Sequence, residues 1–176
     1  MPFSSVDYIP PVVRKLYQFD FTTVLDLGCG IGQWGYVIRF HHDLMHNRMK
    51  PEQWQKTILG VEVHDPYNNP VWGLYDRVEE AEIAAFINEG HRHDLIMMVE
   101  VLEHFDKATG IAVLKKIADR CQHFIFSFSN IDQGPWHGNN YEAHRSRWTR
   151  EEIFSLFPQA EVLFETDINF LFYVKT

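Results

Sequence analysis

Residues 24–32 carry the sequence VLDLGCGIG, and this stretch decides the fold of the chain. An apolar run that predicts a buried strand leads directly into three alternating glycines, and Trp34, Val37 and Ile38 then follow at helical spacing. Because glycine has no Cβ, such a turn lets a ligand approach the backbone at the carboxyl end of the strand. Asp26 precedes the first glycine, and we expect its carboxylate to project into the same crevice.

Apolar runs and helical stretches alternate along the rest of the chain. After a first strand at 23–27, we expect strands at 57–63, 76–80, 94–99 and 123–128. This alternation is typical of an α/β protein with a largely parallel sheet. The last two apolar runs, 160–165 and 169–174, are too close in sequence for a helical crossover and should pair antiparallel. The sequence therefore predicts a Rossmann-like three-layer sandwich, in which a mostly parallel seven-stranded sheet ends in a C-terminal antiparallel hairpin.

Helices are predicted between these strands. One begins at Gln33 and continues through Met45, a short one covers 83–87, and another has its apolar face at Ile111, Leu114, Ala118 and Cys121. The last is expected to begin with a capping box, in which Thr149 and Glu152 satisfy each other's backbone N–H groups.

Composition fits one globular domain over residues 1–176. Hydrophobic residues make up 45% of the chain, enough for a packed core, and the two cysteines form no CxxC pair. No secretory signal or membrane-spanning run is found, so a cytoplasmic protein is expected. The formal net charge of −8 counts against nucleic acid as a partner, because phosphate binding favours clustered lysine and arginine.

Two histidine-rich segments, 41–46 and 91–93, raise the question of a metal site. Their spacing makes no convincing ligand set with nearby carboxylates. A solvated helix and a solvated loop explain them better, and no metal is expected.

The glycine turn resembles motif I of the class I S-adenosylmethionine-dependent methyltransferases, whose pattern D-x-G-x-G-x-G is fully present. The resemblance implies that Asp26, Gly28, Cys29, Gly30 and Gly32 surround the methionine and ribose portion of the cofactor. It also implies that the acid before the turn helps to hold the amino end of that molecule.

Residues 30–35 also match the G-x-G-x-x-G pattern of nicotinamide cofactor domains. Two features disfavour that alternative. The dinucleotide pattern places its first glycine directly after the strand, a place that Gly28 already holds, and it expects an acid about 20 residues later. The next strand-end acid, Glu62, lies too far along the chain.

The resemblance extends to the ends of the later strands. It implies that Glu62, followed by Val63, binds the ribose hydroxyls, and that Glu82 and Ile83 meet the adenine. An exposed charge run explains Glu82 equally well.

Residues 94–105 resemble motif IV of many small-molecule methyltransferases. The resemblance places Glu100 beside the methyl-transfer site, with Glu103 and His104 opening the next helix. His104 then faces the substrate mouth or serves only in packing.

The long polar and aromatic segment 129–146 is the remaining candidate for acceptor binding. Tyr141, His144 and His137 are expected to hold or deprotonate an acceptor hydroxyl or amine, while Asn139 and Glu142 order the loop or contact the cofactor. A lid without acid–base chemistry is the alternative.

Motifs for other acceptors do not fit. The Asp65-Pro66-Tyr67 triplet is similar to the amino-methylating D-P-P-Y motif but follows the wrong strand, and the Pro-Cys of cytosine enzymes is missing. The resemblance therefore implies transfer of a methyl group from S-adenosylmethionine to an oxygen or nitrogen of a small molecule. A protein or nucleic acid acceptor presented by a partner subunit, and a non-catalytic cofactor-binding subunit, remain alternatives. The sequence does not determine the oligomeric state.

Overall fold

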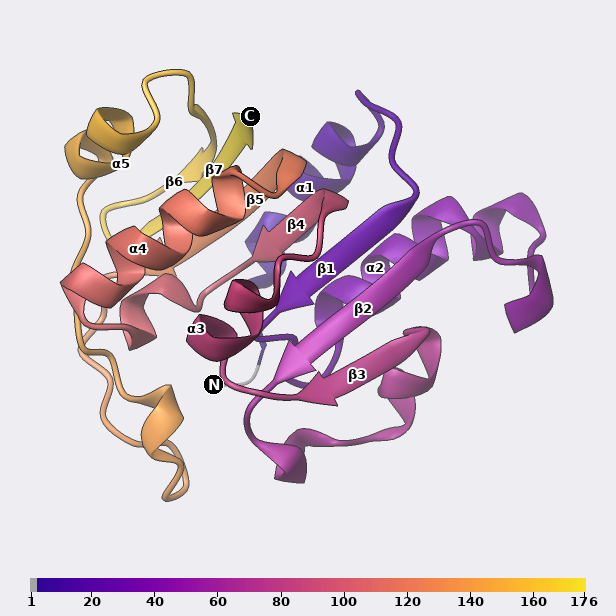
Figure 1. The fold of residues 1–176 in the computed structure, drawn as a ribbon, viewed down its shortest axis with the longest axis horizontal. Helices are drawn as coiled ribbons and strands as arrows, with labels where there is room; N and C mark the ends of the chain where they lie inside the picture. The colour runs from indigo at the N-terminus through magenta and orange to yellow at the C-terminus, as the bar shows by residue number, and fades with distance from the viewer. Residues whose placement is uncertain (1–2) are drawn as a thin grey trace.

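The computed structural model describes residues 3–176, which form a seven-stranded sheet (Figure 1). The strands are β1 (Thr23–Leu27), β2 (Thr57–Glu62), β3 (Arg77–Glu80), β4 (His93–Met98), β5 (Cys121–Ser129), β6 (Glu161–Glu165) and β7 (Asn169–Lys175). Their spatial order is β3-β2-β1-β4-β5-β7-β6. The first five strands are parallel, and β7 lies antiparallel between β5 and β6. The predicted sheet with its antiparallel hairpin is confirmed.

Helices cover both faces of the sheet and give the predicted three layers. The helices are α1 (Ile9–Leu16), α2 (Gln33–His42), α3 (Ile83–Phe86), α4 (Lys107–Ala118) and α5 (Arg150–Leu156). The apolar residues of α1 and α2 form one buried cluster with one face of the central strands. Those of α3, α4 and α5 form a second cluster on the opposite face, in front of the sheet in Figure 1. Within residues 3–176, no helix has the length and hydrophobicity needed to traverse a lipid bilayer.

The prediction that α2 continues through Met45 is wrong. The helix ends at His42, and Met45 lies exposed in the helical turn η2 (Leu44–His46). The cause is Asp43, which is fully buried and binds Arg39 at 2.6 Å and Arg48 at 2.7 Å. The expected solvated segment is therefore partly internal, because a buried carboxylate needs charged partners.

Helix α4 also begins and packs differently from the prediction. Asp106 caps it through the backbone N–H of Thr109, and Glu103 and His104 lie before it in the turn η7 (Leu102–His104). The buried face consists of Gly110, Val113, Leu114 and Ile117, while Cys121 opens β5. The capping box at the start of α5 is confirmed.

Three glycines make room for Tyr75 beneath the glycine turn. A Cβ on Gly35 would lie 2.1 Å from the Tyr75 ring, and Cβ atoms on Gly32 and Gly60 would also crowd it. The Tyr75 hydroxyl donates to Asp26 at 2.6 Å and accepts from the backbone N–H of Gly35 at 2.9 Å. The third glycine of the G-x-G-x-x-G match therefore has a packing role.

Replacing Gly35 with alanine should destabilise the fold, because the new methyl group would collide with a ring that cannot move in the core. Overpacking of this kind costs about 1–3 kcal/mol, which denaturant unfolding monitored by circular dichroism would measure. Gly73→Ala is the matched control, since a Cβ there meets nothing within 4 Å. Equal stability of Gly35→Ala and the wild type would show that Tyr75 is not held in this slot.

Candidate functional site

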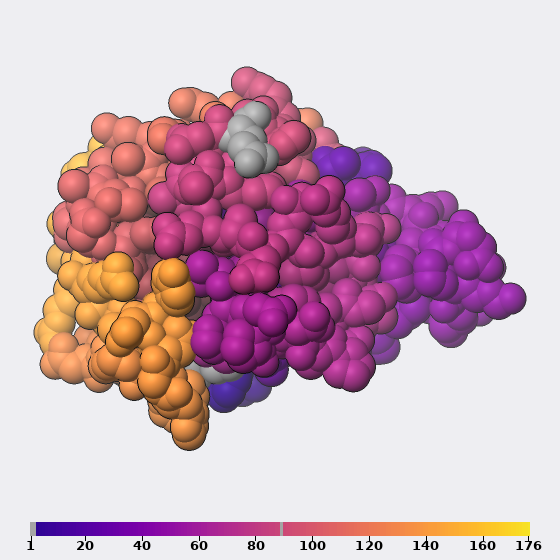
Figure 2. Space-filling model, turned by 60° about the horizontal axis from the view of Figure 1, so that its bottom comes forward, coloured from indigo at the N-terminus to yellow at the C-terminus, as the bar shows by residue number. Residues whose placement is uncertain are grey.

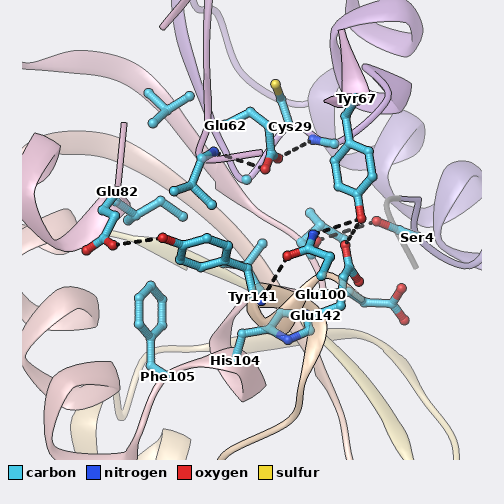
Figure 3. Close-up of a pocket in the computed structure, with 18 of the residues that line it drawn as sticks. Ser4, Cys29, Glu62, Tyr67, Glu82, Glu100, His104, Phe105, Tyr141 and Glu142 are labelled. Atoms are coloured by element: carbon cyan, nitrogen blue, oxygen red, sulfur yellow. Dashed lines mark hydrogen bonds between the residues drawn. The ribbon is translucent and has the colours of Figure 1, made fainter. Parts of the chain in front are cut away.

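A cavity of about 320 Å³ opens at the carboxyl ends of β1, β2 and β4. Its wall includes most of the cofactor-binding residues that the sequence predicted: Gly28, Cys29, Gly30, Glu62, Val63, Glu82, Ile83 and Glu100. Figure 3 shows the labelled side chains of this wall converging from the strand ends and from the segment that contains Tyr141. The fold therefore brings together residues that are far apart in the sequence.

The glycine turn forms the floor of this cavity. Gly28, Gly30 and Gly32 have φ angles of 71°, 52° and 94°, in the left-handed region that favours glycine. The backbone N–H groups of Gly28 and Cys29 both donate to the Val61 carbonyl, at 2.8 and 3.1 Å. The turn is thereby fixed against the end of β2.

Asp26 does not project into the cavity, so this expectation needs correction. Its side chain is 1% exposed and lies on the α2 face of the sheet, beneath the turn, where it accepts the Tyr75 hydroxyl. Gly32 likewise begins α2 and faces Tyr75. Side chains alternate between the faces of a strand, and this alternation directs Asp26 into the layer below.

Glu62 holds the turn and lines the cavity at once. One carboxylate oxygen accepts from the Gly30 N–H at 2.9 Å, and the other accepts from Val63 and His64 at 3.0 Å each. Burial raises the pKa of this carboxyl, while the three N–H bonds oppose the rise. Carboxylates have about four lone-pair sites, so Glu62 retains capacity to accept a ligand hydroxyl.

Segment 130–146, which we call the crossing loop, closes one side of the cavity. It lies beside the helical turn η4 (Asp65–Tyr67), as Figure 2 shows for the orange and purple parts of the surface. Tyr67 donates to Glu142 at 2.7 Å and accepts from the Asn139 amide at 3.1 Å. Tyr141 reaches across to Glu82, with 3.2 Å between the hydroxyl and the carboxylate (Figure 3).

Tyr67 is a wall residue that the sequence prediction missed. The triplet Asp65-Pro66-Tyr67 resembles an amino-methylating motif but follows the wrong strand for it, so the motif alone gives Tyr67 no role. The available signal was its place directly after β2, since polar residues after parallel strands gather at the ligand edge of the sheet.

A second hollow adjoins the first. Its wall shares Phe3, Ser4, Glu100 and His104 with the cavity. Beyond this junction it is lined mainly by the following small, polar or apolar residues: Ser5, Glu103, Ser129, Ile131, Gln133, His144, Ile168 and Asn169. The two spaces meet at Glu100 and His104, where β4 leads into η7.

The histidines predicted to take part in catalysis occupy three different places. His104 lies at the junction, and His144 lies in the second hollow, with 4.9 Å between the two ring centroids. Burial lowers the pKa of His104 to about 4, helped by the charge of His144, so His104 is uncharged at neutral pH. Burial also lowers the pKa of His144. His137 is exposed beside Trp136 and contributes to neither wall, which separates it from the other two.

Comparison with known proteins adds a family to this geometry. A family model described as "Methyltransferase domain" matches residues 7–162. No curated protein sequence matches the chain.

Solved structures share the fold at low sequence identity. The N-terminal domain of EvdMO1 with S-adenosylhomocysteine bound is 19% identical, with a TM-score of 0.69 over 98% of this chain and 82% of that one. Magnesium protoporphyrin IX methyltransferase from Synechocystis PCC 6803, with S-adenosylmethionine bound, is 12% identical, with a TM-score of 0.65 over 97% and 79%. The small RNA methyltransferase HEN1 is 17% identical, with a TM-score of 0.63 over 99% of this chain and 25% of that one.

Asp26 should contribute a decline in stability as pH rises from about 4 to about 7. Burial raises the pKa of this carboxyl to about 7, so the folded protein keeps a proton that the unfolded chain releases near pH 4. The Asp26→Asn variant should lose this part of the decline, which denaturant unfolding at several pH values would reveal. Asp167→Asn, at an exposed aspartate of the hairpin turn, should keep the wild-type slope. An unchanged slope in Asp26→Asn would contradict the assignment.

Removing the Tyr67 hydroxyl should loosen the crossing loop. Tyr67→Phe keeps the ring but loses the hydrogen bonds to Glu142 and Asn139, each worth about 0.5–3 kcal/mol. Amide hydrogen exchange within 133–142 should then be about tenfold faster. Tyr36→Phe, at an exposed position on α2, controls for the loss of a tyrosine hydroxyl, and equal protection in both variants would show that the loop is held elsewhere.

Proposed function

The chain belongs to the methyltransferase-domain family of S-adenosylmethionine-dependent enzymes, and we propose that it methylates an oxygen or nitrogen of a small molecule. The observation that carries this proposal is the pair of adjoining spaces that meet at Glu100 and His104. One space suits the cofactor and the other suits an acceptor. The cofactor supplies an electrophilic methyl group on a sulfonium sulfur.

The cavity fits such a cofactor. The backbone of the glycine turn is open to a ligand, and Glu62 offers a carboxylate oxygen to ribose hydroxyls at the end of β2. Glu82 and Ile83, at the start of α3, provide an acceptor and an apolar contact for the adenine. Asp26 acts indirectly in this proposal, since it positions the turn through Tyr75.

Positioning and exclusion of water are the main tasks of this chain. Holding two reactants in line supplies about 7–11 kcal/mol of the barrier reduction in well-oriented systems. The crossing loop limits access to the cavity from one side through Tyr67 and Tyr141. His104 and His144 border the acceptor hollow, and Tyr141 borders the cofactor cavity. His137 has no part in this proposal.

The size of the second hollow, about 350 Å³, favours a small acceptor over a macromolecule. The structure of the EvdMO1 domain in the presence of D-fucose supports a small acceptor, since that protein has the same fold. A protein or nucleic acid acceptor is the second candidate. The likeness to the small RNA methyltransferase HEN1 supports RNA within it, but the net charge of −8 disfavours RNA. A non-catalytic subunit would not need the acceptor hollow.

Cofactor binding should depend on Glu62. Glu62→Gln removes the charge that strengthens ribose hydrogen bonds, each worth about 1.5–3 kcal/mol, so the Kd for S-adenosylhomocysteine should rise about 10–100-fold in calorimetric titration. Glu80→Gln is the matched control, because Glu80 pairs with Glu62 in the register of β2 and β3 but is exposed outside the cavity wall. Binding of NAD in place of S-adenosylhomocysteine would refute the proposed cofactor.

Labelled methyl transfer would identify the acceptor class. Incubation with S-adenosylmethionine carrying a tritiated methyl group should label a metabolite extract and leave protein and RNA extracts unlabelled. Label in protein or RNA alone would favour the second candidate. Cofactor binding without transfer to any extract would favour a non-catalytic subunit.

A further inference from the structure

Glu100, two residues beyond the end of β4, lines both spaces, the cavity and the second hollow. Figure 3 labels Glu100 beside Glu142, with His104 nearby. A methyl group passing from one space to the other would pass beside this residue.

The backbone at Glu100 is strained. Its φ is +54°, in the left-handed region that residues other than glycine, asparagine and aspartate rarely adopt. The Glu100 N–H donates to the Ser127 hydroxyl at 2.7 Å, which helps to hold this conformation against β5. Strain of this kind persists only where the surroundings enforce it, and it gathers at functional sites. A glycine would relieve the strain, so the glutamate side chain needs another explanation.

The groups around Glu100 describe the molecule that the second hollow accepts. Glu103 is 1% exposed on the hollow's inner wall, and one of its carboxyl oxygens has no hydrogen-bond partner. His104 and His144 face the same space with lowered pKa values. Among residues 3–176, no lysine or arginine lines the hollow. An anionic acceptor would therefore find no lysine or arginine side chain to pair with in the hollow, whereas its carboxyl groups can accept hydrogen bonds from hydroxyl groups.

We propose that Glu100 is the catalytic base of the methyl transfer and that the acceptor is an uncharged molecule that reacts through a hydroxyl group. This inference rests on the proposed function and names the substrate class of the same site. The acceptor O–H bond breaks, and its proton moves to a Glu100 carboxylate oxygen. The freed electron pair of the oxygen forms the bond to the methyl carbon. The carbon–sulfur bond breaks at the same time, and its electron pair stays on the sulfur, which becomes a neutral thioether.

Burial makes Glu100 a stronger base than an exposed glutamate. Burial raises its pKa, and the neighbouring Tyr8 and Glu103 also have raised pKa values, Glu103 at about 8, as expected where acids share a buried space. The groups that face the Glu100 side chain are the Ser5 backbone N–H, which opposes the rise in pKa, together with Tyr8, Glu103 and His104. The rate of transfer should therefore rise with pH as Glu100 loses its proton, and then reach a plateau.

Two substitutions at one position test the base. Glu100→Gln keeps the size of the side chain, and Glu100→Gly removes the side chain and the backbone strain together. Both variants should bind S-adenosylhomocysteine within about threefold of the wild type and lose about 10²–10⁴-fold in kcat. Glu100→Gly should melt at or above the wild-type temperature, which separates a catalytic loss from a folding defect. Loss of the rising limb of the pH–rate profile in Glu100→Gln is the readout that a structural role would not produce.

The acceptor class is tested with a metabolite extract divided by passage over an anion-exchange resin and then a cation-exchange resin. Tritiated methyl groups should appear in products of the fraction that neither resin retains, and the carbon chemical shift of a product made with a ¹³C-labelled methyl group should identify oxygen as the methylated atom. Label only in the retained fractions, or in none, would overturn the inference, as would a Glu100→Gln enzyme with the wild-type rate and pH profile. Activity that disappears on chelation of divalent cations would also overturn it, because Glu100 would then be a ligand. Failure to bind S-adenosylhomocysteine at all would instead refute the proposed function.

Discussion

The hydrogen bond from the Tyr75 hydroxyl to Asp26, 2.6 Å long and fully buried, is the contact on which the site depends. It joins the strand that enters the glycine turn to the segment that precedes β3. The same hydroxyl accepts from Gly35 at the start of α2. The Tyr75 hydroxyl oxygen thus links β1 to α2 on either side of the glycine turn. This link holds the turn in place from below, so the backbone that faces the cavity can consist of glycines.

That contact also explains the number of glycines in this part of the chain. Gly28 and Gly30 provide the left-handed turn, whereas Gly35 and Gly60 lack side chains because Tyr75 fills the space beside them. One glycine-rich segment therefore meets two separate demands. Gly35 is needed for packing against Tyr75. It nevertheless completes the G-x-G-x-x-G pattern that nicotinamide cofactor domains use for binding.

The sequence predicted the strands well because buried parallel strands are continuous apolar runs, and it predicted the hairpin because a three-residue connection permits no crossover. Helix ends were less predictable. The end of α2 is set by Asp43, whose partners Arg39 and Arg48 are identified only by tertiary contacts.

Most strand-end residues of the cavity were also predicted, since they follow the strands directly. Asp26 was misplaced, because its neighbours alone do not reveal that Tyr75 lies beneath it. Tyr67 was missed because its partners lie about 70 residues later, in the crossing loop.

The crossing loop shows why acceptor binding is the hardest property to derive from such a chain. Its histidines and tyrosine are close in sequence, yet Tyr141 reaches the cofactor cavity, His144 the second hollow, and His137 the solvent. A loop has no fixed periodicity, so the direction of each side chain depends on anchors such as the bond between Tyr67 and Glu142. Glu100, in contrast, is placed by the end of a buried strand. Rigid elements position reactive groups more precisely than loops do, and for this reason the base is to be sought at the end of β4, with the loop controlling access.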